Sequence, residues 1–305
     1  MNTDFELNGI LLVDKPKGFT SFDVIAKLRG ILRIKRLGHS GTLDPMATGV
    51  LPVLVGKATK ASDILPVDEK SYEAGFKFGI STDTQDITGE VLTNSNISIS
   101  LERLENAAES FVGDILQVPP MYSAVSVGGK RLYELARQGK TVEREPRQRK
   151  VNYIKINSYD PLTREGVMSV SVSKGTYVRT LINDIGEKLE CGGVMTSLRR
   201  TSSSGFDIKQ CYTLEQIQKY SDDDNLSHII LPVESAFNST YDKVSLNTRC
   251  TQLYKNGVKL RLEQAGIQGI SNDKTVCIYD CDNVFLGLAK TDIEKNELKI
   301  YKNFF

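Results

Sequence analysis

The sequence predicts an α+β fold, in which helices pack on a mixed, mostly antiparallel sheet and a small β-rich region follows. Strand-like segments are joined partly by short turns and partly by segments with helical periodicity. Beyond residue 236, several short strand-like segments alternate with turn residues, which suits a small β-barrel or sandwich. The polar stretch 219–225 is the best linker candidate. We expect two domains, over residues 1–236 and 237–305.

The first third of the chain predicts a strand, a helix and two more strands. Residues 9–13 (GILLV) are apolar throughout, as in a buried strand. Thr20 and Ser21 are candidates for a helix N-cap. Residues 50–55 predict a short buried strand, and residues 70–79 alternate in polarity like a half-buried one. The apolar residues at helical spacing after the cap are Phe22, Ile25, Leu28 and Leu32.

The middle of the chain adds three helices and a pair of strands. Apolar spacing predicts helices over 101–111, 131–138 and 178–189. Residues 149–159 and 166–173 predict two strands, the second alternating between serine and apolar residues. The strands are thus joined partly by hairpins and partly by helices, which favours the α+β class.

Composition excludes several classes of protein. The 305 residues include 40% hydrophobic and 25% charged residues, the proportions of an ordinary globular protein. Five cysteines, an odd number, favour free thiols in a reducing cytoplasm. With only two histidines we expect no zinc site. No secretory signal is expected at the N-terminal end, and the apolar run VLPVLVG is too short to span a membrane.

Charge is segregated along the chain although the net charge is only +1. Residues 130–150 contain eight basic residues against three acidic ones. Further basic groups lie at 27–36 and at Arg199 and Arg200, whereas acids gather at 221–224. This distribution favours a polyanion footprint on one face, although each run alone is also typical of a solvated surface.

The stretch GHSGTLDPMATGVLP at residues 38–52 contains a single carboxylate, Asp44, in a glycine-rich loop. Residues 38–41 are one residue short of the serine-hydrolase elbow, residues 56–59 lack the glycine spacing of a phosphate-binding loop, and no metal or nucleotide motif occurs elsewhere. A carboxylate can act as a nucleophile if a nearby positive charge keeps it ionised. The alternative is an ordinary Asp-Pro turn.

Several ordered blocks, together covering roughly residues 8–235, closely resemble the TruB family of tRNA pseudouridine-55 synthases. The resemblance implies a pseudouridine synthase fold and a C-terminal PUA-like RNA-binding domain. It also implies isomerisation of uridine to pseudouridine in the T loop of tRNA, with base flipping and no cofactor. The blocks are GILLVDKPKGFTSFDV, GHSGTLDPMATGVLPVLVGKATK, KSYEAGFKFGISTDTQDITGEV, VPPMYSAVSVGGKRLYELARQG and SKGTYVRTLINDIGEKL.

The resemblance assigns the catalytic residues. Asp44 is implied as the nucleophile or essential carboxylate, and whether C1′ or C6 is attacked, or an elimination comes first, stays open. Arg179 would pair with Asp44 and keep it charged. Tyr72 would stack on the flipped base and could exchange a proton, but it is equally suited to face the core of a strand.

The resemblance also assigns residues around the substrate. His39 would lie near the displaced base, whereas Tyr177 and Leu198 would line the uridine pocket. Leu198 suits the core equally well. The basic segment would bind phosphates of the T arm with little sequence preference. The expected phosphate contacts are Lys15, Lys130, Arg131, Arg147 and Arg149.

The expected partner is the tRNA T stem-loop, with no membrane and no obligatory protein partner. The family analogy predicts a cytoplasmic monomer, and the guide-RNA-dependent relatives are an alternative within the class. The second reading is an RNA-binding or tRNA-folding protein whose catalysis is dispensable. A hydrolase that uses Ser40 is a third and weaker alternative.

Overall fold

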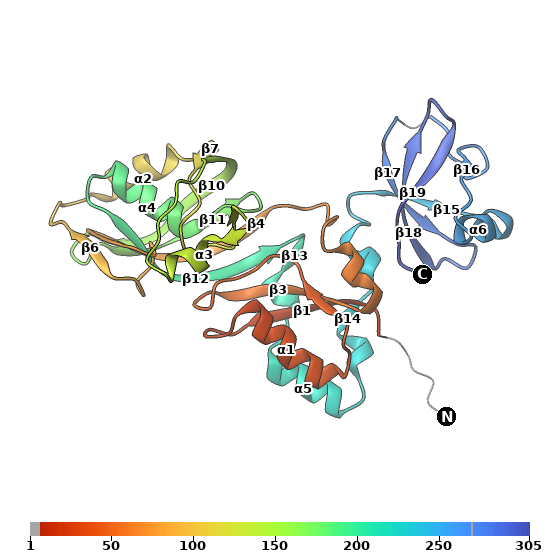
Figure 1. Cartoon of the computed structure of the whole chain (residues 1–305), viewed down its shortest axis with the longest axis horizontal. Coiled ribbons are helices and arrows are strands. Elements are labelled where there is room, and N and C mark those ends of the chain that lie inside the picture. The colour runs from red at the N-terminus through yellow and green to blue at the C-terminus, as the bar shows by residue number, and fades with distance from the viewer. Residues whose placement is uncertain (1–6, 270) are drawn as a thin grey trace.

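The computed structural model describes residues 7–269 and 271–305. Its main sheet is mixed and mostly antiparallel, with strands in the order β14-β1-β3-β12-β4-β11-β10-β7 and with β2 and β13 pairing at its side (Figure 1). The α+β prediction is confirmed. The strands are β1 (Gly9–Lys15), β2 (Leu37–His39), β3 (Thr48–Val55), β4 (Lys70–Phe78), β7 (Gly113–Gln117), β10 (Arg147–Asp160), β11 (Glu165–Val172), β12 (Gly193–Ser203), β13 (Phe206–Asp207) and β14 (Ile230–Leu231).

The only parallel pairing among the described strands of this sheet joins β3 to β12. It comprises two residue pairs, Arg199 with Thr48 and Arg200 with Gly49. Gly49 has a φ of +104°, and a Cβ there would lie 2.2 Å from the carbonyl oxygen of Arg200, so only glycine fits. This short seam connects the β1–β3 half of the sheet to the β4–β11–β10 half.

Helices cover the two halves separately. α1 (Ser21–Leu32) and α5 (Leu214–Asp222) pack with β1 and β3, and Ser221 of α5 donates to the Ile31 carbonyl at 2.9 Å. α2 (Leu101–Glu109) and α4 (Val178–Lys188) pack with β4, β11 and β12. Residues of β1 and β3 alternate between two core clusters, so both faces are buried, which explains their continuous apolar sequences.

The start of α1 agrees with the sequence, and so does its predicted apolar face except at Phe22. Thr20 is the N-cap and forms a capping box with Asp23. Phe22, predicted to face the core, is 68% exposed and contacts His39 instead. The other predicted positions, Ile25, Leu28 and Leu32, are buried as expected, and Val24 and Ile31 complete the buried face.

The predicted linker at 219–225 is wrong. Residues up to Asp222 belong to α5, and Asp223 caps its C-terminal end. Its polar residues form the exposed side of an amphipathic helix whose Ile217 is fully buried.

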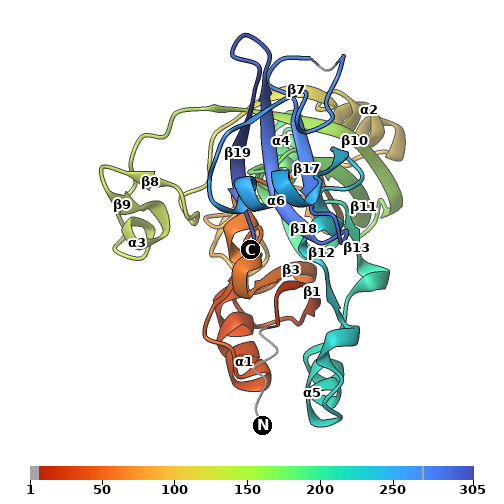
Figure 2. The same ribbon diagram turned by 90° about the vertical axis from the view of Figure 1, so that its right-hand side faces the viewer.

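An arm of irregular chain extends from the main sheet between β7 and β10. It contains the hairpin β8 (Ser126–Val127) and β9 (Lys130–Arg131) and the short helix α3 (Leu132–Ala136). Figure 2 shows this arm projecting away from the sheet. A second hairpin pairs β5 (Ile80–Thr82) with β6 (Val91–Asn94).

The last part of the chain forms a separate five-stranded sheet in the order β15-β17-β18-β19-β16, with α6 (Thr248–Lys255) beside it (Figure 1). Its strands are β15 (Asp242–Ser245), β16 (Leu260–Arg261), β17 (Thr275–Tyr279), β18 (Phe285–Asp292) and β19 (Glu297–Asn303). The short 3-10 helices of the chain are η1 (Gly56–Ala61), η2 (Ile208–Gln210), η3 (Leu226–His228) and η4 (Val233–Ala236).

An aromatic cluster joins the two sheets. Phe237 is fully buried and lies within 6.3 Å, centroid to centroid, of the rings of Tyr241, Phe285 and Phe304. The same core contains residues of β1 and β3, such as Ile10. No helix in the described ranges is long and apolar enough to cross a membrane.

Candidate active site

The loop between β2 and β3, residues 40–47, is fixed by hydrogen bonds to the start of α1 and the turn before it. The Leu43 amide donates to the Ser21 hydroxyl at 2.9 Å, and the Gly18 amide donates to the Pro45 carbonyl at 2.8 Å. The Ala47 amide donates to the Asp44 carbonyl at 3.0 Å. These bonds hold the Asp44 side chain at the surface, where it is 40% exposed.

The side chain of Lys15 supports this loop from the interior and does not lie at the surface. It is fully buried, and its Nζ donates to the carbonyls of Phe19 at 2.6 Å and Pro16 at 2.9 Å, with Pro45 at 3.5 Å. Burial lowers the pKa of Lys15 to about 8, and the negative charge of Asp44 opposes this shift. The predicted contact between Lys15 and RNA phosphate is therefore corrected, because solvent does not reach this side chain.

Arg179 lies in the first turn of α4 and faces Asp44. Its Nη1 is 3.1 Å from Oδ2 of Asp44, and its Nη2 donates to the Tyr122 carbonyl. The guanidinium also lies 5.8 Å from the centre of the Tyr177 ring. The side chain is only 6% exposed, so the pair joins a buried cation to a half-exposed carboxylate. Asp44 and Arg179 therefore meet as the sequence resemblance implies.

A second carboxylate, Asp86, was missed in the sequence. Its Oδ2 is 3.7 Å from Nη1 of Arg179, and its side chain is 7% exposed. Its Oδ1 accepts hydrogen bonds from the Thr88 amide and hydroxyl and from the Thr84 hydroxyl, at 2.5–2.9 Å. The surrounding sequence STDTQDITGE is ordinary turn chemistry, and nothing in it indicates that this acid is buried.

Tyr72 and Leu198 form the apolar side of the site. Tyr72 in β4 is 7% exposed, and it lies in register between Val170 of β11 and Arg200 of β12. Leu198 is 9% exposed and belongs to the same core cluster, together with Leu43 of the Asp44 loop. Both side chains therefore belong to the core at the edge of the site.

Arg200 is buried at the centre of the molecule, contrary to its prediction as part of a basic surface group. Its Nε donates to the Val50 carbonyl at 2.7 Å and its Nη2 to the Gly41 carbonyl at 3.0 Å. Burial lowers its pKa, and electrostatic interaction with the neighbouring Tyr72 opposes this. Arg199 instead pairs with Asp14 at 2.7 Å. Neither arginine contributes to a basic patch.

His39 lies at the end of β2 beside the loop, and Tyr177 lies directly before α4. The half-buried His39 ring meets Phe22 edge-on at 5.3 Å, and burial, assisted by Arg200, lowers its pKa. The Tyr177 backbone exchanges two hydrogen bonds with the buried Gln117 amide, at 2.8 and 3.1 Å. Gln117 is thus a second positioning residue that the sequence did not reveal, because it occurs in a short strand without a motif.

The remaining predicted phosphate contacts lie on the arm and at its base. Lys130, Arg131 and Arg147 are exposed. Arg149 is half-buried, and its Nε donates to the Gly175 carbonyl at 3.0 Å, which ties β10 to the loop before α4. The arm therefore presents basic groups on the chain segment that projects in Figure 2.

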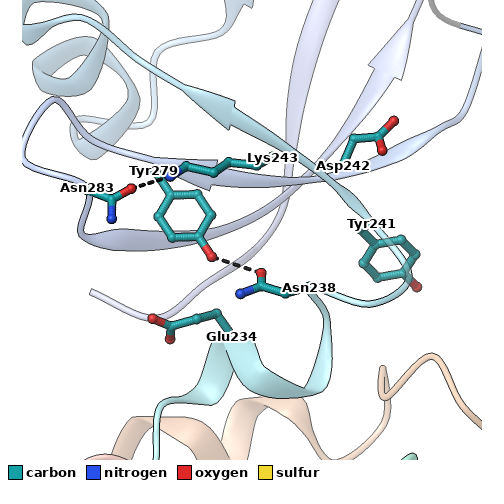
Figure 3. A pocket seen from close by; sticks show the side chains of 7 residues that line it. All are labelled: Glu234, Asn238, Tyr241, Asp242, Lys243, Tyr279 and Asn283. Atoms are coloured by element: carbon teal, nitrogen blue, oxygen red, sulfur yellow. Dashed lines mark hydrogen bonds between the residues drawn. The ribbon is translucent and has the colours of Figure 1, made fainter.

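A hollow of about 500 Å³ lies elsewhere, between η4 and the C-terminal sheet (Figure 3). Its polar groups bond to one another: Tyr279 donates to Asn238 at 2.8 Å, and Lys243 donates to Asn283 and lies 4.5 Å from the centre of the Tyr279 ring. None of the residues predicted for the site lines this hollow.

Two family models match this chain. The one described as "TruB family pseudouridylate synthase (N terminal domain)" matches residues 29–178, and "tRNA pseudouridylate synthase B C-terminal domain" matches residues 179–238. The chain belongs to the TruB family of pseudouridylate synthases. Asp44 lies in the region that the first model matches, and Arg179 is the first residue that the second model matches.

Curated relatives match along nearly the whole length of this TruB-family chain. The "tRNA pseudouridine synthase B" of Clostridium novyi (strain NT) is 45% identical over 93% of this chain and 95% of its own. That of Lachnoclostridium phytofermentans is 45% identical over 98% of this chain and 100% of its own.

Solved structures share the fold. A chain of the "Cbf5-Nop10-Gar1 Complex" is 26% identical with a TM-score of 0.74, covering 100% of this chain and 91% of that one. A chain of an "H/ACA RNP bound to a substrate RNA containing 2'-deoxyuridine" is 25% identical with a TM-score of 0.74, over 97% and 85%. The pseudouridine synthase fold predicted from the sequence is confirmed.

Proposed function

We propose that this TruB-family synthase isomerises uridine 55 in the T loop of tRNA to pseudouridine. The main observation that supports this proposal is the 3.1 Å ion pair between buried Arg179 and half-exposed Asp44. Asp44 lies on a loop that hydrogen bonds hold in place. The names of the 45%-identical relatives support tRNA as the substrate class.

The chemistry rearranges one nucleoside without adding or removing atoms. The bond from C1′ to N1 breaks, a bond from C1′ to C5 forms, the C5 proton leaves and N1 takes up a proton. Because reactant and product are isomers, the overall reaction needs no redox or group-transfer cofactor. We assign the nucleophilic role to Asp44, which the ion pair with Arg179 orients.

The target base must leave the helical stack to reach Asp44. We assign Tyr72 and Leu198 as the flat apolar wall against which it rests, and Tyr177 as the ring on the Arg179 side. His39 would occupy the neighbourhood of the displaced base. The burial of Tyr72 and Leu198 at the edge of the core supports a rigid wall rather than an adaptable one.

We further propose residues 1–236 as the catalytic domain and 237–305 as a PUA-like RNA-binding domain. The separate five-stranded sheet supports this division. The projecting arm, with Lys130, Arg131 and Arg147, would bind T-arm phosphates. Greater similarity to the tRNA synthases than to the ribonucleoprotein chains supports a cytoplasmic monomer that acts without an obligatory protein partner.

The test uses an unmodified T-arm stem-loop, digested to nucleosides after incubation and separated by chromatography, because uridine and pseudouridine have equal mass. Wild-type protein should convert the single target uridine, and Asp44→Asn should bind the RNA without converting it. Asp114→Asn, at an exposed position of β7, is the matched control and should be fully active. Tight binding without conversion by wild-type protein would instead support an RNA-binding or tRNA-folding role.

A further inference from the structure

Two cationic groups without a counter-charge lie beside the catalytic loop. Lys70, the first residue of β4, is half-buried, and Arg200 is fully buried. A methyl group placed on Gly41 would lie 2.8 Å from Nζ of Lys70 and 3.5 Å from Nη1 of Arg200. Both nitrogens therefore approach the same point of the loop, three residues before Asp44.

Neither nitrogen is satisfied by the described residues. Nη1 of Arg200 has no hydrogen-bond partner there, although its other nitrogens bond to carbonyls. Lys70 forms no hydrogen bond or ion pair within the described ranges, and the nearby Asp68 pairs with exposed Lys174 at 3.9 Å. An uncompensated pair of partly desolvated cations is costly, so this place favours an anion.

A third unsatisfied group lies on the adjacent strand. Ser203 of β12 is directly opposite Lys70 in the β4–β12 ladder, so the two side chains share one face of the sheet. Ser203 is fully buried, and its hydroxyl has no partner among the described groups. Three donors therefore lie at this end of β4 and β12 without acceptors.

Because Lys70 is half-buried, its protonation state depends on the charges around it. Desolvation, together with the positive charges of Arg200 and Lys174, lowers its pKa to about 8, and Asp68 opposes this shift. A bound anion would restore the proton affinity of this ammonium group.

We propose that the ammonium group of Lys70, reinforced by the Arg200 guanidinium, binds an RNA phosphodiester immediately beside the target uridine. The inference rests on the proposed function, since the ligand is the substrate RNA. An ammonium group suits the role because it binds phosphate as a compact charge with three donors. Anchoring this phosphate would hold the extruded nucleotide in position above Asp44.

The test measures binding of the T-arm stem-loop to Lys70→Met in the Asp44→Asn background as KCl is raised. Loss of one phosphate contact should weaken binding about tenfold and flatten the slope of log K against log salt by about 0.7–0.9. Lys70→Arg should restore the slope because it keeps the charge. Lys219→Met, on the exposed side of α5, is the matched control and should bind like its parent.

A double-mutant cycle identifies the phosphate. RNAs with one neutral methylphosphonate, either 5′ or 3′ of the target uridine, are compared on both proteins. The parent should bind one of the two methylphosphonate RNAs about tenfold more weakly than the unmodified RNA. The same methylphosphonate should weaken binding to Lys70→Met only slightly. Fully additive losses at both positions would overturn the proposal.

If Lys70→Met does not fold, the same RNAs are compared on the Asp44→Asn parent between pH 7 and 9.5. The penalty of the methylphosphonate should shrink above pH 8, as Lys70 loses its proton, and a constant penalty would overturn the proposal. Deprotonation of Lys15 in this pH range should change the affinity for both RNAs equally, so it cancels when the two affinities are compared. Additive losses with normal uridine conversion by wild-type protein would refute only this site, whereas absent conversion would refute the proposed function.

Discussion

Arg179 lies between two carboxylates that are held in different ways. Asp86 accepts three hydrogen bonds from threonines on Oδ1 and is buried, whereas Asp44 is half-exposed. The geometry suggests a division of labour, in which Asp86 fixes the guanidinium and Asp44 stays free to react. A single arginine thus links the reacting group to the rigid interior.

Asp86→Asn tests this division. The amide keeps the size of the side chain but removes the charge that orients Arg179, so we expect single-turnover conversion to fall about tenfold to a hundredfold, or about 1.4–2.7 kcal/mol. T-arm affinity should stay within about threefold, because Asp86 is buried away from the RNA. The exposed neighbour variant Asp83→Asn is the control, and equal losses in both variants would contradict the assignment.

At the residue scale, the sequence alone supplied little. Only the family resemblance identified Asp44, Tyr72 and Arg179. Asp86 and Gln117 could not be recognised, since their importance arises from burial and from partners 60 or more residues away. Lys15 and Arg200 were wrongly placed at the surface, because charge patterning does not show that backbone carbonyls accept hydrogen bonds from a buried cation.

The elements were predictable where periodicity was long and one-sided. The half-buried strand at residues 70–79 matches β4, and the helix at 178–189 matches α4 within one residue. Short or unusual segments were less predictable: α3 covers only Leu132–Ala136, and the 219–225 stretch is largely helical. The apolar pattern alone also placed Phe22 on the buried face of α1, because it does not show that a helix beside an active site can expose an aromatic ring.

The exposure of Phe22 on α1 has a measurable consequence. Phe22→Ala should change the free energy of unfolding by less than about 0.5 kcal/mol, because the ring is 68% exposed. Leu28→Ala on the same helix should cost about 2–5 kcal/mol, because Leu28 is fully buried. Urea unfolding of both variants checks the difference, and equal costs would show that α1 packs with Phe22 inward.

Asp184 makes α4 sensitive to pH. Burial raises its pKa to about 6 from 3.8, so the folded state binds the proton more tightly than the unfolded state does. Stability contributed by this group is therefore lost as the pH rises from about 4 through 6, and the cost persists at pH 7. Asp184→Asn should raise the unfolding free energy at pH 7 by on the order of 2 kcal/mol and change little at pH 4. A gain that is equal at both pH values would contradict this explanation.

At the scale of the whole molecule, composition and element order predicted the fold class but not the strand order. The sheet places β12 between β3 and β4, although more than a hundred residues separate β12 from either in the chain. Such pairings depend on tertiary packing, which no local pattern contains. The aromatic cluster between the sheets was equally invisible, because Phe237, Phe285 and Phe304 are scattered in the sequence.

That cluster should couple the two sheets in unfolding. Phe237→Ala removes a fully buried ring and should cost about 3–5 kcal/mol. Calorimetry should then resolve a separate transition at lower temperature for the C-terminal sheet. Tyr301→Ala, at an exposed position of β19, should preserve the wild-type profile, and a single shifted peak for Phe237→Ala would argue against coupling through this ring.

The two-residue pairing between β3 and β12 can form only late in synthesis, and the proposed active site is complete only then. A ribosome completes the Asp44 loop early, but Arg179 and the strand that seats Tyr72 beside Leu198 emerge only after some 200 residues. The growing chain therefore carries the proposed nucleophile through a large part of its synthesis without its arginine partner. Nascent chains that end before Gly193 should be catalytically silent, so RNA modification begins only once translation of this domain is nearly complete.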